Sequence, residues 1–292
     1  MDIRYFESLI CVAELGSIAR AARAQNLTAA AVGQRIAILE QHYDTELLDR
    51  SSRSAVPTRA CEELLPLARE IVIKFSEMES AIEPTGISGK LSLGAIPTAL
   101  TGILPGAVRQ LAKEAPKLTL EIKPGTSEAL FSDLKDRRLD AAIIALPPFE
   151  MPGQFQVKVL REEPLVLLAK KGMGKSIREK LERNPYIAFD SQSWSGCGAV
   201  RFLKDEKIPV DPFYELDALE PIEKLVAEGM GVSLVPKWPD LQLKTRGVES
   251  EIINDPAYHR KLALVMKEDC TRPQVAEVLC QALFGQVSTE AS

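Results

Sequence analysis

The sequence is poor in the residue types that most often build metal centres. It contains two histidines, His42 and His259, so a histidine-rich metal site is excluded and a histidine-based triad would depend on one of these two. Its five cysteines show neither a C-x-x-C motif nor any metal-ligand spacing. An odd number of cysteines in a long chain favours free thiols in a reducing compartment, and no metal or cofactor is expected.

Long apolar stretches are also missing. Nowhere do about 18 uncharged apolar residues follow one another, which argues against a membrane-spanning helix. Residues 1–7 show no basic segment followed by an apolar run, so no signal peptide is expected. The sequence therefore predicts a soluble cytoplasmic protein.

An excess of positive charge is lacking as well. The chain has 36 Lys and Arg against 41 Asp and Glu, a net charge of −5, so its overall charge does not indicate a nucleic-acid partner. Its 46% hydrophobic and 26% charged residues exclude a largely disordered chain and a disulfide-rich miniprotein. The length of 292 residues predicts about two domains.

Three regions differ in pattern along the chain. Residues 1–58 contain short helical patterns, and residues 59–83 form one long helical pattern that ends in a Pro- and Gly-containing segment, 84–89. From Lys90 onward, short apolar runs alternate with amphipathic helices. That alternation predicts an α/β fold with a mainly parallel sheet.

Two short helices in the first region are separated by very few residues. Gly16 closes a first helix, Ser17 is an N-cap for a helix over 18–25, and Thr28 is an N-cap for a helix over 29–43. This spacing matches a helix-turn-helix unit, whose second helix enters a major groove of DNA. The same turn occurs in small helical bundles that never contact DNA, so both interpretations stay open.

The segment after these helices predicts a hairpin. Residues 47–50 and 55–57 flank the polar stretch 51–54, as in the wing of a winged helix-turn-helix. Basic and acidic residues are equal in number through position 59, but the placement of the arginines favours phosphate binding. They lie on the helix pair and the wing: Arg20, Arg23, Arg35, Arg50 and Arg53.

Several segments together resemble LysR-type transcriptional regulators. They follow that family's order along nearly the whole chain: 16–22, 27–36, 39–40, 47–50, 57–58, 64–68, 89–94 and 229–236. The resemblance implies a winged helix-turn-helix over 1–58 and a linker helix and hinge over 59–89. It also implies a two-subdomain effector module, like periplasmic binding proteins, over 90–292. The expected partners are double-stranded operator DNA, a small anionic effector, further copies of the chain and RNA polymerase.

Departures from the family pattern fall on the second helix of the unit. Residues 28–31 read Thr-Ala-Ala-Ala where the family has Ser-Gln-Pro-Ala, and Gly33-Gln34 replaces a Ser-Arg pair. Alanine has no side-chain donor for a base edge, whereas glutamine contacts adenine. We therefore expect direct readout by Thr28, Gln34 and Arg35, apolar contact by Ala29 and Ala30, and phosphate contact by Arg20, Arg50 and Arg53. Gly33 either costs helix stability, about 1 kcal/mol relative to alanine, or permits a closer approach of the backbone.

The long helical pattern carries an apolar seam. Its residues are spaced by steps of 4, 3, 4, 3 and 4: Leu64, Ala68, Ile71, Phe75, Met78 and Ile82. A repeat of about 3.5 residues is the signature of a helix that packs along another helix. The stripe either docks on the protein's own body or pairs with a second chain, and charged residues at the other positions favour the dimer. The resemblance implies an antiparallel pair, and dimers that join into homotetramers.

The effector module shows two candidate ligand contacts at strand ends. Thr98 follows the first strand, and Thr126-Ser127 opens the helix after the second. Ligands of β-α-β units lie beyond the carboxyl ends of the strands, where hydroxyls and free N–H groups suit a carboxylate. An isolated Ser127 is better explained as an N-cap without a ligand, but two such caps at equivalent ends of adjacent strands favour a pocket. In the resembled family these positions line the inducer cleft, which Pro97, Leu146 and Phe149 would also wall.

The second subdomain is expected over 163–266, with the chain returning to the first near Lys267. There Trp194 either covers the cleft and stacks on a flat ligand or is a partly buried surface anchor. Cys197 lies close by, but no second cysteine occurs between 198 and 269, which argues against redox sensing.

Two other classes compete with a regulator. An enzyme on this fold would draw on Asp190, Asp217 and Glu220, yet no nucleophile–base pair or phosphate-binding glycine motif is evident. A solute-binding protein for transport is opposed by the missing signal peptide and by the N-terminal 89 residues. The sequence therefore predicts a sequence-specific transcription regulator, not an enzyme, whose effector changes the closure of two subdomains.

Overall fold

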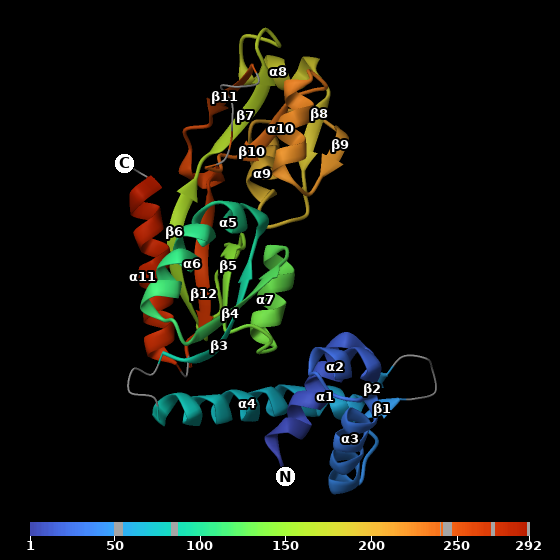
Figure 1. Cartoon of the computed structure of the whole chain (residues 1–292). Helices are drawn as coiled ribbons and strands as arrows, with labels where there is room; N and C mark the ends of the chain where they lie inside the picture. The colour runs from blue at the N-terminus through green and yellow to red at the C-terminus, as the bar shows by residue number, and fades with distance from the viewer. Residues whose placement is uncertain (50–54, 83–86, 240, 242–246, 270–271, 291–292) are drawn as a thin grey trace. The chain divides into compact units, whose positions relative to one another are not determined.

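The computed structural model describes the chain except residues 50–54, 83–86, 240, 242–246, 270–271 and 291–292 (Figure 1). It leaves undescribed the side chains at 76–77, 79–82 and 287–290 as well. The chain forms two compact units: Met1–Gly89 with Asp136–Arg138, and Lys90–Lys135 with Leu139–Ser292. In the described part of the chain, no helix is long and apolar enough to cross a membrane.

The first unit begins with three helices whose ends follow their cap residues. They are α1 (Ile3–Leu15), α2 (Ile18–Ala24) and α3 (Ala29–Tyr43). Gly16 ends α1 in the left-handed region at φ 62°, where glycine carries no steric penalty. The Ser17 hydroxyl accepts the backbone N–H of Arg20 at 3.4 Å, and Thr28 accepts that of Ala31 at 3.1 Å. The predicted helix-turn-helix and its caps are confirmed.

Apolar residues at helical spacing hold the head together, a name used here for residues 1–68. Leu9 and Val12 of α1 meet Val32, Ile36 and Leu39 of α3 in a core that excludes water. Burying each such side chain contributes roughly 1.5–3 kcal/mol. This core fixes which side of α3 faces inward and leaves the opposite side exposed.

A short hairpin follows α3, as expected for a wing. Strand β1 (Leu48–Asp49) pairs antiparallel with β2 (Val56–Pro57). The Glu40 carboxylate accepts the backbone N–H groups of Leu47 and Leu48 at 3.0 and 3.2 Å, which ties β1 to α3. The tip of the hairpin, with Arg50 and Arg53, lies outside the described residues.

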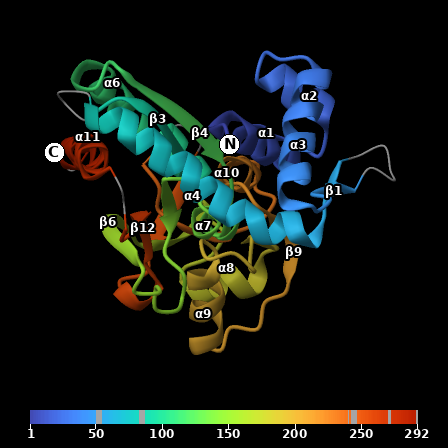
Figure 2. The ribbon, with the colours of Figure 1, turned by 90° about the horizontal axis from the view of Figure 1, so that it is seen from below.

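Helix α4 (Arg59–Ile82) is a single long helix that continues from the head (Figure 2). Its first turns pack into the head, because Cys61 and Ala68 are fully buried and Leu65 is nearly so. Leu64 also packs partly on this core. The prediction that Ala68 belongs to a seam between two chains is therefore wrong, since its own chain covers it.

A different apolar ridge of α4 remains exposed. Ile71, Phe75 and Met78 expose 45%, 43% and 67% of their surface, and Leu67, which the sequence interpretation omitted, exposes 57%. The Ile82 side chain lies outside the described residues. We call Leu67, Ile71, Phe75 and Met78 the α4 ridge.

The first subdomain of the second unit is a five-stranded sheet in the order β4-β3-β5-β12-β6. Helices α6 and α11 pack together on one side of it, and α7 lies on the other (Figure 1). The strands are β3 (Gly89–Ala95), β4 (Leu118–Pro124), β5 (Ala141–Ala145), β6 (Phe155–Glu163) and β12 (Arg260–Lys267). The helices are α5 (Pro97–Thr101), α6 (Ile103–Glu114), α7 (Ser127–Lys135) and α11 (Pro273–Glu290).

The second subdomain holds two small sheets, ordered β10-β7-β11 and β8-β9, which a bridge between Tyr186 and Val232 joins. Its strands are β7 (Leu165–Lys170), β8 (Tyr186–Phe189), β9 (Pro212–Leu216), β10 (Ser233–Pro236) and β11 (Val248–Ile252). Its helices are α8 (Ile177–Arg183), α9 (Cys197–Asp205), α10 (Leu219–Ala227) and the short η2 (Pro256–Tyr258).

The sheets are mixed, so the expectation of a mainly parallel sheet is wrong. Strand β12 runs antiparallel to both β5 and β6, and β10 and β11 run antiparallel to β7. Parallel pairs are β3 with β5 and β8 with β9. The chain leaves the first sheet after Glu163 and returns to it with Arg260 at the start of β12, whereas the sequence placed the return near Lys267.

The burial of Ala68 generates a stability prediction. Ala68→Leu should destabilise the head by about 1–3 kcal/mol, because the added methyl groups have no space in a filled core. Ala37→Leu makes the same substitution on the exposed side of α3 and should change stability by less than about 0.5 kcal/mol. Urea denaturation, monitored by the circular dichroism of the helices, measures the stability of both variants. Equal stabilities would contradict the assignment of Ala68 to the core.

Candidate functional site

The outer side of α3 is a smooth, exposed surface. Thr28, Ala29, Ala30 and Gln34 are exposed on it. Apart from its two chain neighbours and the backbone of its own helix, no described heavy atom lies within 4 Å of the position that a Cβ would take on Gly33. The predicted contact residues are therefore grouped on one side of a helix whose other side is locked into the head, with Arg35 as the exception.

Arg35 is turned toward α1 instead. Its guanidinium donates from Nη1 to the Ser8 hydroxyl at 3.0 Å and to the Arg4 carbonyl at 3.4 Å. Ser8 is fully buried and donates to the Gln25 side chain at 2.8 Å, so this network links all three helices. Its place follows from the helical period, since position 35 lies between the buried residues Val32 and Leu39. A base contact by Arg35 would require it to leave these partners.

Helix α2 supplies exposed positive charge. Arg20 and Arg23 are exposed on this helix, and neither forms an ion pair with a described residue. Arginines without an internal carboxylate partner retain their donors for phosphate oxygens. The predicted phosphate contacts of Arg50 and Arg53 concern residues outside the described ranges.

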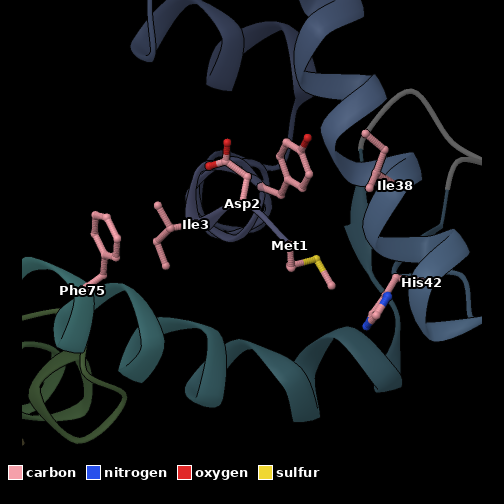
Figure 3. A pocket seen from close by; sticks show the side chains of 7 residues that line it. Met1, Asp2, Ile3, Ile38, His42 and Phe75 are labelled. Carbon is pink, nitrogen blue, oxygen red and sulfur yellow. The ribbon is translucent and has the colours of Figure 1, made fainter.

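A shallow hollow lies beside the α4 ridge (Figure 3). Its volume is about 700 Å³, and Phe75 forms one of its walls. The start of α1 and the end of α3 supply the other walls, namely Met1, Asp2, Ile3, Tyr5, Ile38 and His42. The ridge and this hollow together make an apolar, uneven surface on the first unit.

In the second unit, a cavity of about 190 Å³ lies between the two subdomains. It forms where the carboxyl ends of β3 and β4 face those of β8 and β9, so it obeys the strand-end rule used on the sequence. Four predicted contacts line it: Pro97, Thr98, Thr126 and Ser127. The other lining residues are Ile96, Gly125, Glu128, Phe189, Asp190, Ser193, Ser195, Asp217, Ala218, Leu219, Glu220 and Arg260.

Three residues predicted to wall this cleft do not line it. The Trp194 ring packs 5.6 Å from the ring of Phe131 and 5.5 Å from that of Phe149. Its backbone N–H donates to the Glu128 carboxylate at 2.5 Å. Trp194 is thus a partly buried anchor between the subdomains, and its interpretation as a cover over the ligand is wrong. Leu146 and Phe149 likewise lie outside the cavity.

The hydroxyl groups of the cleft already have local partners. Thr126 accepts the N–H of Ala129 at 3.3 Å and caps α7, whereas Ser127 is buried and accepts the N–H of Ala145 at 3.0 Å. A hydroxyl that accepts one hydrogen bond still has its own hydrogen to donate. Thr126 is therefore the cap of α7, and both hydroxyls keep a hydrogen that they can donate to a ligand in the cleft.

Arg260 is the cleft residue that the sequence interpretation missed. Its side chain is only 4% exposed and is ion-paired to the Glu163 carboxylate, with Nε and Oε2 2.6 Å apart. Its Nη2 donates to Thr98 Oγ1 at 3.2 Å, and its Nη1 approaches Ser195 Oγ at 3.5 Å. These partners come from both subdomains and lie far away in sequence, so no local pattern could have identified them.

Four carboxylates also line the cavity: Glu128, Asp190, Asp217 and Glu220. None of the four forms an ion pair with a described residue. Burial raises the pKa of Asp190 above its ordinary value of 3.8, and repulsion by Glu128, Glu215 and Asp217 raises it further. The described residues contain no group of three or more His, Cys, Asp or Glu side chains that could hold a metal ion.

Cys197 begins α9 beside this cleft. Its thiol lies 3.0 Å from the Trp194 carbonyl, to which it donates. Burial raises the pKa of the Cys197 thiol, which disfavours the reactive thiolate.

The pKa of Asp190 generates a prediction on pH and stability. Between 3.8 and its raised pKa, the folded protein binds more protons than the unfolded chain, so stability falls as pH rises. Asp190→Asn removes this penalty and should raise Tm at neutral pH by less than about 3 °C, because the residue is only half-buried. The gain should shrink as pH falls toward 3.8. Thermal denaturation across this range measures it, with Asp211→Asn, which lies outside the cavity, as a control. A pH-independent gain would contradict the assignment.

Two family models match the chain. The helix-turn-helix model described as "Bacterial regulatory helix-turn-helix protein, lysR family" matches residues 3–62. The model described as "LysR substrate binding domain" matches residues 84–287, which is more than half of the chain.

Curated relatives and solved structures agree with these matches. The transcriptional regulator YofA of Bacillus velezensis is 32% identical over 80% of each chain, and the transcriptional regulator SoxR of Arthrobacter sp. is 28% identical over 91% of this chain and 90% of its own. In fold, the chain resembles a full-length OxyR variant from Pseudomonas aeruginosa (TM-score 0.76, 22% identity, 97% of this chain and 94% of that one). It also resembles full-length CbnR complexed with its target DNA (TM-score 0.62, 18% identity, 98% and 100%).

These matches cover the head and the effector module in the order in which the structure builds them, and the family consists of transcriptional regulators, which are not enzymes. The chain belongs to the LysR family and is a DNA-binding transcriptional regulator with an effector-binding domain.

Proposed function

We propose that this regulator reads a two-fold symmetric operator with α3 of two chains, and that a small molecule in the cleft controls it. The observation that carries the proposal is the division of α3 into a locked side and an exposed side. Val32, Ile36 and Leu39 fix the helix in the head, and Arg35 ties it to α1 and α2. The exposed N-terminal half of a recognition helix is the part that meets base edges.

On this surface, Gln34 carries most of the base recognition. Its amide donates and accepts at once, as contact to adenine requires, whereas Ala29 and Ala30 offer only methyl groups that suit thymine. Thr28 uses its hydroxyl as the cap of α3, which leaves a smaller role for it in readout. Arg20 and Arg23 on α2, with Arg50 and Arg53 on the hairpin, supply phosphate contacts. Arg35 positions the helix.

The α4 ridge makes a second copy of the chain the natural partner. Ile71, Phe75 and Met78 are exposed on this long helix. Covering them with another apolar helix removes apolar surface from water, which lowers the free energy. The hollow beside Phe75 provides a place for side chains of that partner. Pairing of two α4 helices sets the separation of two heads, and assembly through the effector modules completes a homotetramer.

The cleft couples ligand binding to subdomain closure. Arg260 touches Thr98 of the first subdomain and approaches Ser195 of the second, so a ligand that takes these donors changes what holds the subdomains together. A ligand shifts the equilibrium only by its differential affinity for the two closures, typically about 1–3 kcal/mol. The tetramer transmits this change to the spacing of its heads and to RNA polymerase at the promoter.

The role of Gln34 is tested by Gln34→Ala. Loss of the amide should weaken operator binding by about 10- to 100-fold, because one good base contact contributes about 1–3 kcal/mol. Gln41→Ala removes the same side chain from the exposed surface two turns further along α3 and should leave affinity within about twofold. Gel-shift titration on the DNA upstream of the protein's own gene, at two salt concentrations, measures both. Equal losses from the two variants would contradict readout by Gln34.

The α4 ridge is tested by Ile71→Lys. A lysine in the middle of an apolar helix pair cannot be buried without a partner, so the sedimenting mass should fall by half at micromolar concentration. Glu62→Gln makes the same change in charge on the opposite, exposed side of α4 and should leave the mass unchanged. Analytical ultracentrifugation separates the two, and an unchanged mass for Ile71→Lys would place the interface elsewhere.

A further inference from the structure

The charges that line the cleft are unevenly distributed. Arg260 is the single basic residue of the lining, and four carboxylates surround the rest of the cavity. They are not matched by ion pairs to described residues, so their combined charge acts on whatever enters. A purely anionic effector would have to approach all four.

Two of these carboxylates lie at helix starts that would otherwise attract an anion. Glu128 is in the first turn of α7, and Glu220 is in the first turn of α10. The partial positive charge of a helix N-terminus is stabilised by such a carboxylate, which takes the place of an external anion. The N-termini of α7 and α10 therefore offer little to a ligand carboxylate.

The wall of the cleft at Arg260 has the opposite sign. Glu163 lies between two guanidinium groups, those of Arg260 and Arg161, so Arg260 shares its carboxylate partner with a second cation. Arg260 Nη1 has only the long 3.5 Å approach to Ser195, so it still has donor capacity toward the cavity. Thr98 beside it has its hydroxyl hydrogen to donate.

The size of the cavity limits the ligand. Its 190 Å³ corresponds to roughly six water molecules at about 30 Å³ each. A molecule of this size places both of its ends against the lining at the same time. Its two ends therefore meet walls of opposite charge.

We propose that the effector is a small zwitterion of the amino-acid class. Its ammonium group binds among Asp190, Asp217 and Glu220, and its carboxylate binds at Arg260 Nη1 and the Thr98 hydroxyl. This inference rests on the proposed function, because it takes the cleft as the effector site, and it replaces the expectation of an anionic effector with one that carries both charges.

The test is a thermal-shift panel on the full chain. The probes are the twenty standard amino acids, each with its counterpart lacking the amine and its counterpart lacking the carboxylate. At least one amino acid should raise Tm by about 5 °C when present at a hundredfold excess over its Kd, and neither counterpart should do so at the same concentration. Stabilisation by no amino acid, or equal stabilisation by the counterpart lacking the amine, overturns the inference.

Matched variants locate the ammonium group. Asp190→Asn and Glu220→Gln keep the shape of the side chain and remove the charge, so each should weaken binding of the stabilising amino acid by about 10- to 100-fold in titration calorimetry. Asp211→Asn removes the same charge outside the cavity and should leave the affinity unchanged. Full affinity in both cleft variants overturns the inference even where an amino acid binds.

Failure of the inference is distinguishable from failure of the proposed function. Gel shifts on upstream DNA do not depend on the nature of the effector. A specific shift without any response to the amino-acid panel leaves the regulator in place and overturns only the ligand class. Binding of a counterpart lacking the amine that Thr98→Ala abolishes would keep the cleft as the effector site and make the effector an anion.

Discussion

The arrangement of the two subdomains of the effector module depends on the buried ion pair between Arg260 and Glu163. Glu163 ends β6, where the chain leaves the first subdomain, and Arg260 begins β12, where it returns. Removing two charges from water is costly unless each is fully paired, and Arg161, Thr98 and the pair itself provide those partners. Such a pair adds little net stability, and we infer that its role is to specify one arrangement of the crossover. The cleft is built around that arrangement.

The sequence predicted the head well because its determinants are local. Caps at Ser17 and Thr28, a left-handed Gly16 and apolar residues at helical spacing each act within a few residues. The sequence patterns did not predict contacts between segments that are distant along the chain. The predicted seam included Ala68 because this residue fits the heptad spacing, yet the head of the same chain covers it. The spacing of apolar residues shows that a partner covers them. It does not show whether that partner is the same chain or a second one.

The residues of the candidate effector site also fall into those that the sequence predicted and those that it did not. Thr98 and Ser127 were identified because strand ends gather at one edge of a sheet, a rule that depends only on topology. For Trp194 the sequence left a cover over the cleft and a partly buried anchor open, and the structure shows the anchor, because the ring packs against Phe131 and Phe149. Arg260 was missed because its partners become neighbours only in the folded module, after the chain has passed from the first subdomain to the second and back. A side chain's direction is decided by packing that no linear pattern contains.

Packing in the head does not explain why position 33 is a glycine. A glycine within a helix costs about 1 kcal/mol relative to alanine, and open space surrounds the position that a Cβ would occupy there, so the head gains nothing from its absence. The cost falls on the side of α3 that carries Ala29, Ala30 and Gln34. Every neighbour of Gly33 on that surface is also small or unbranched. A helix surface without large side chains fits the close approach to a groove floor that we propose for α3, at the expense of helix stability.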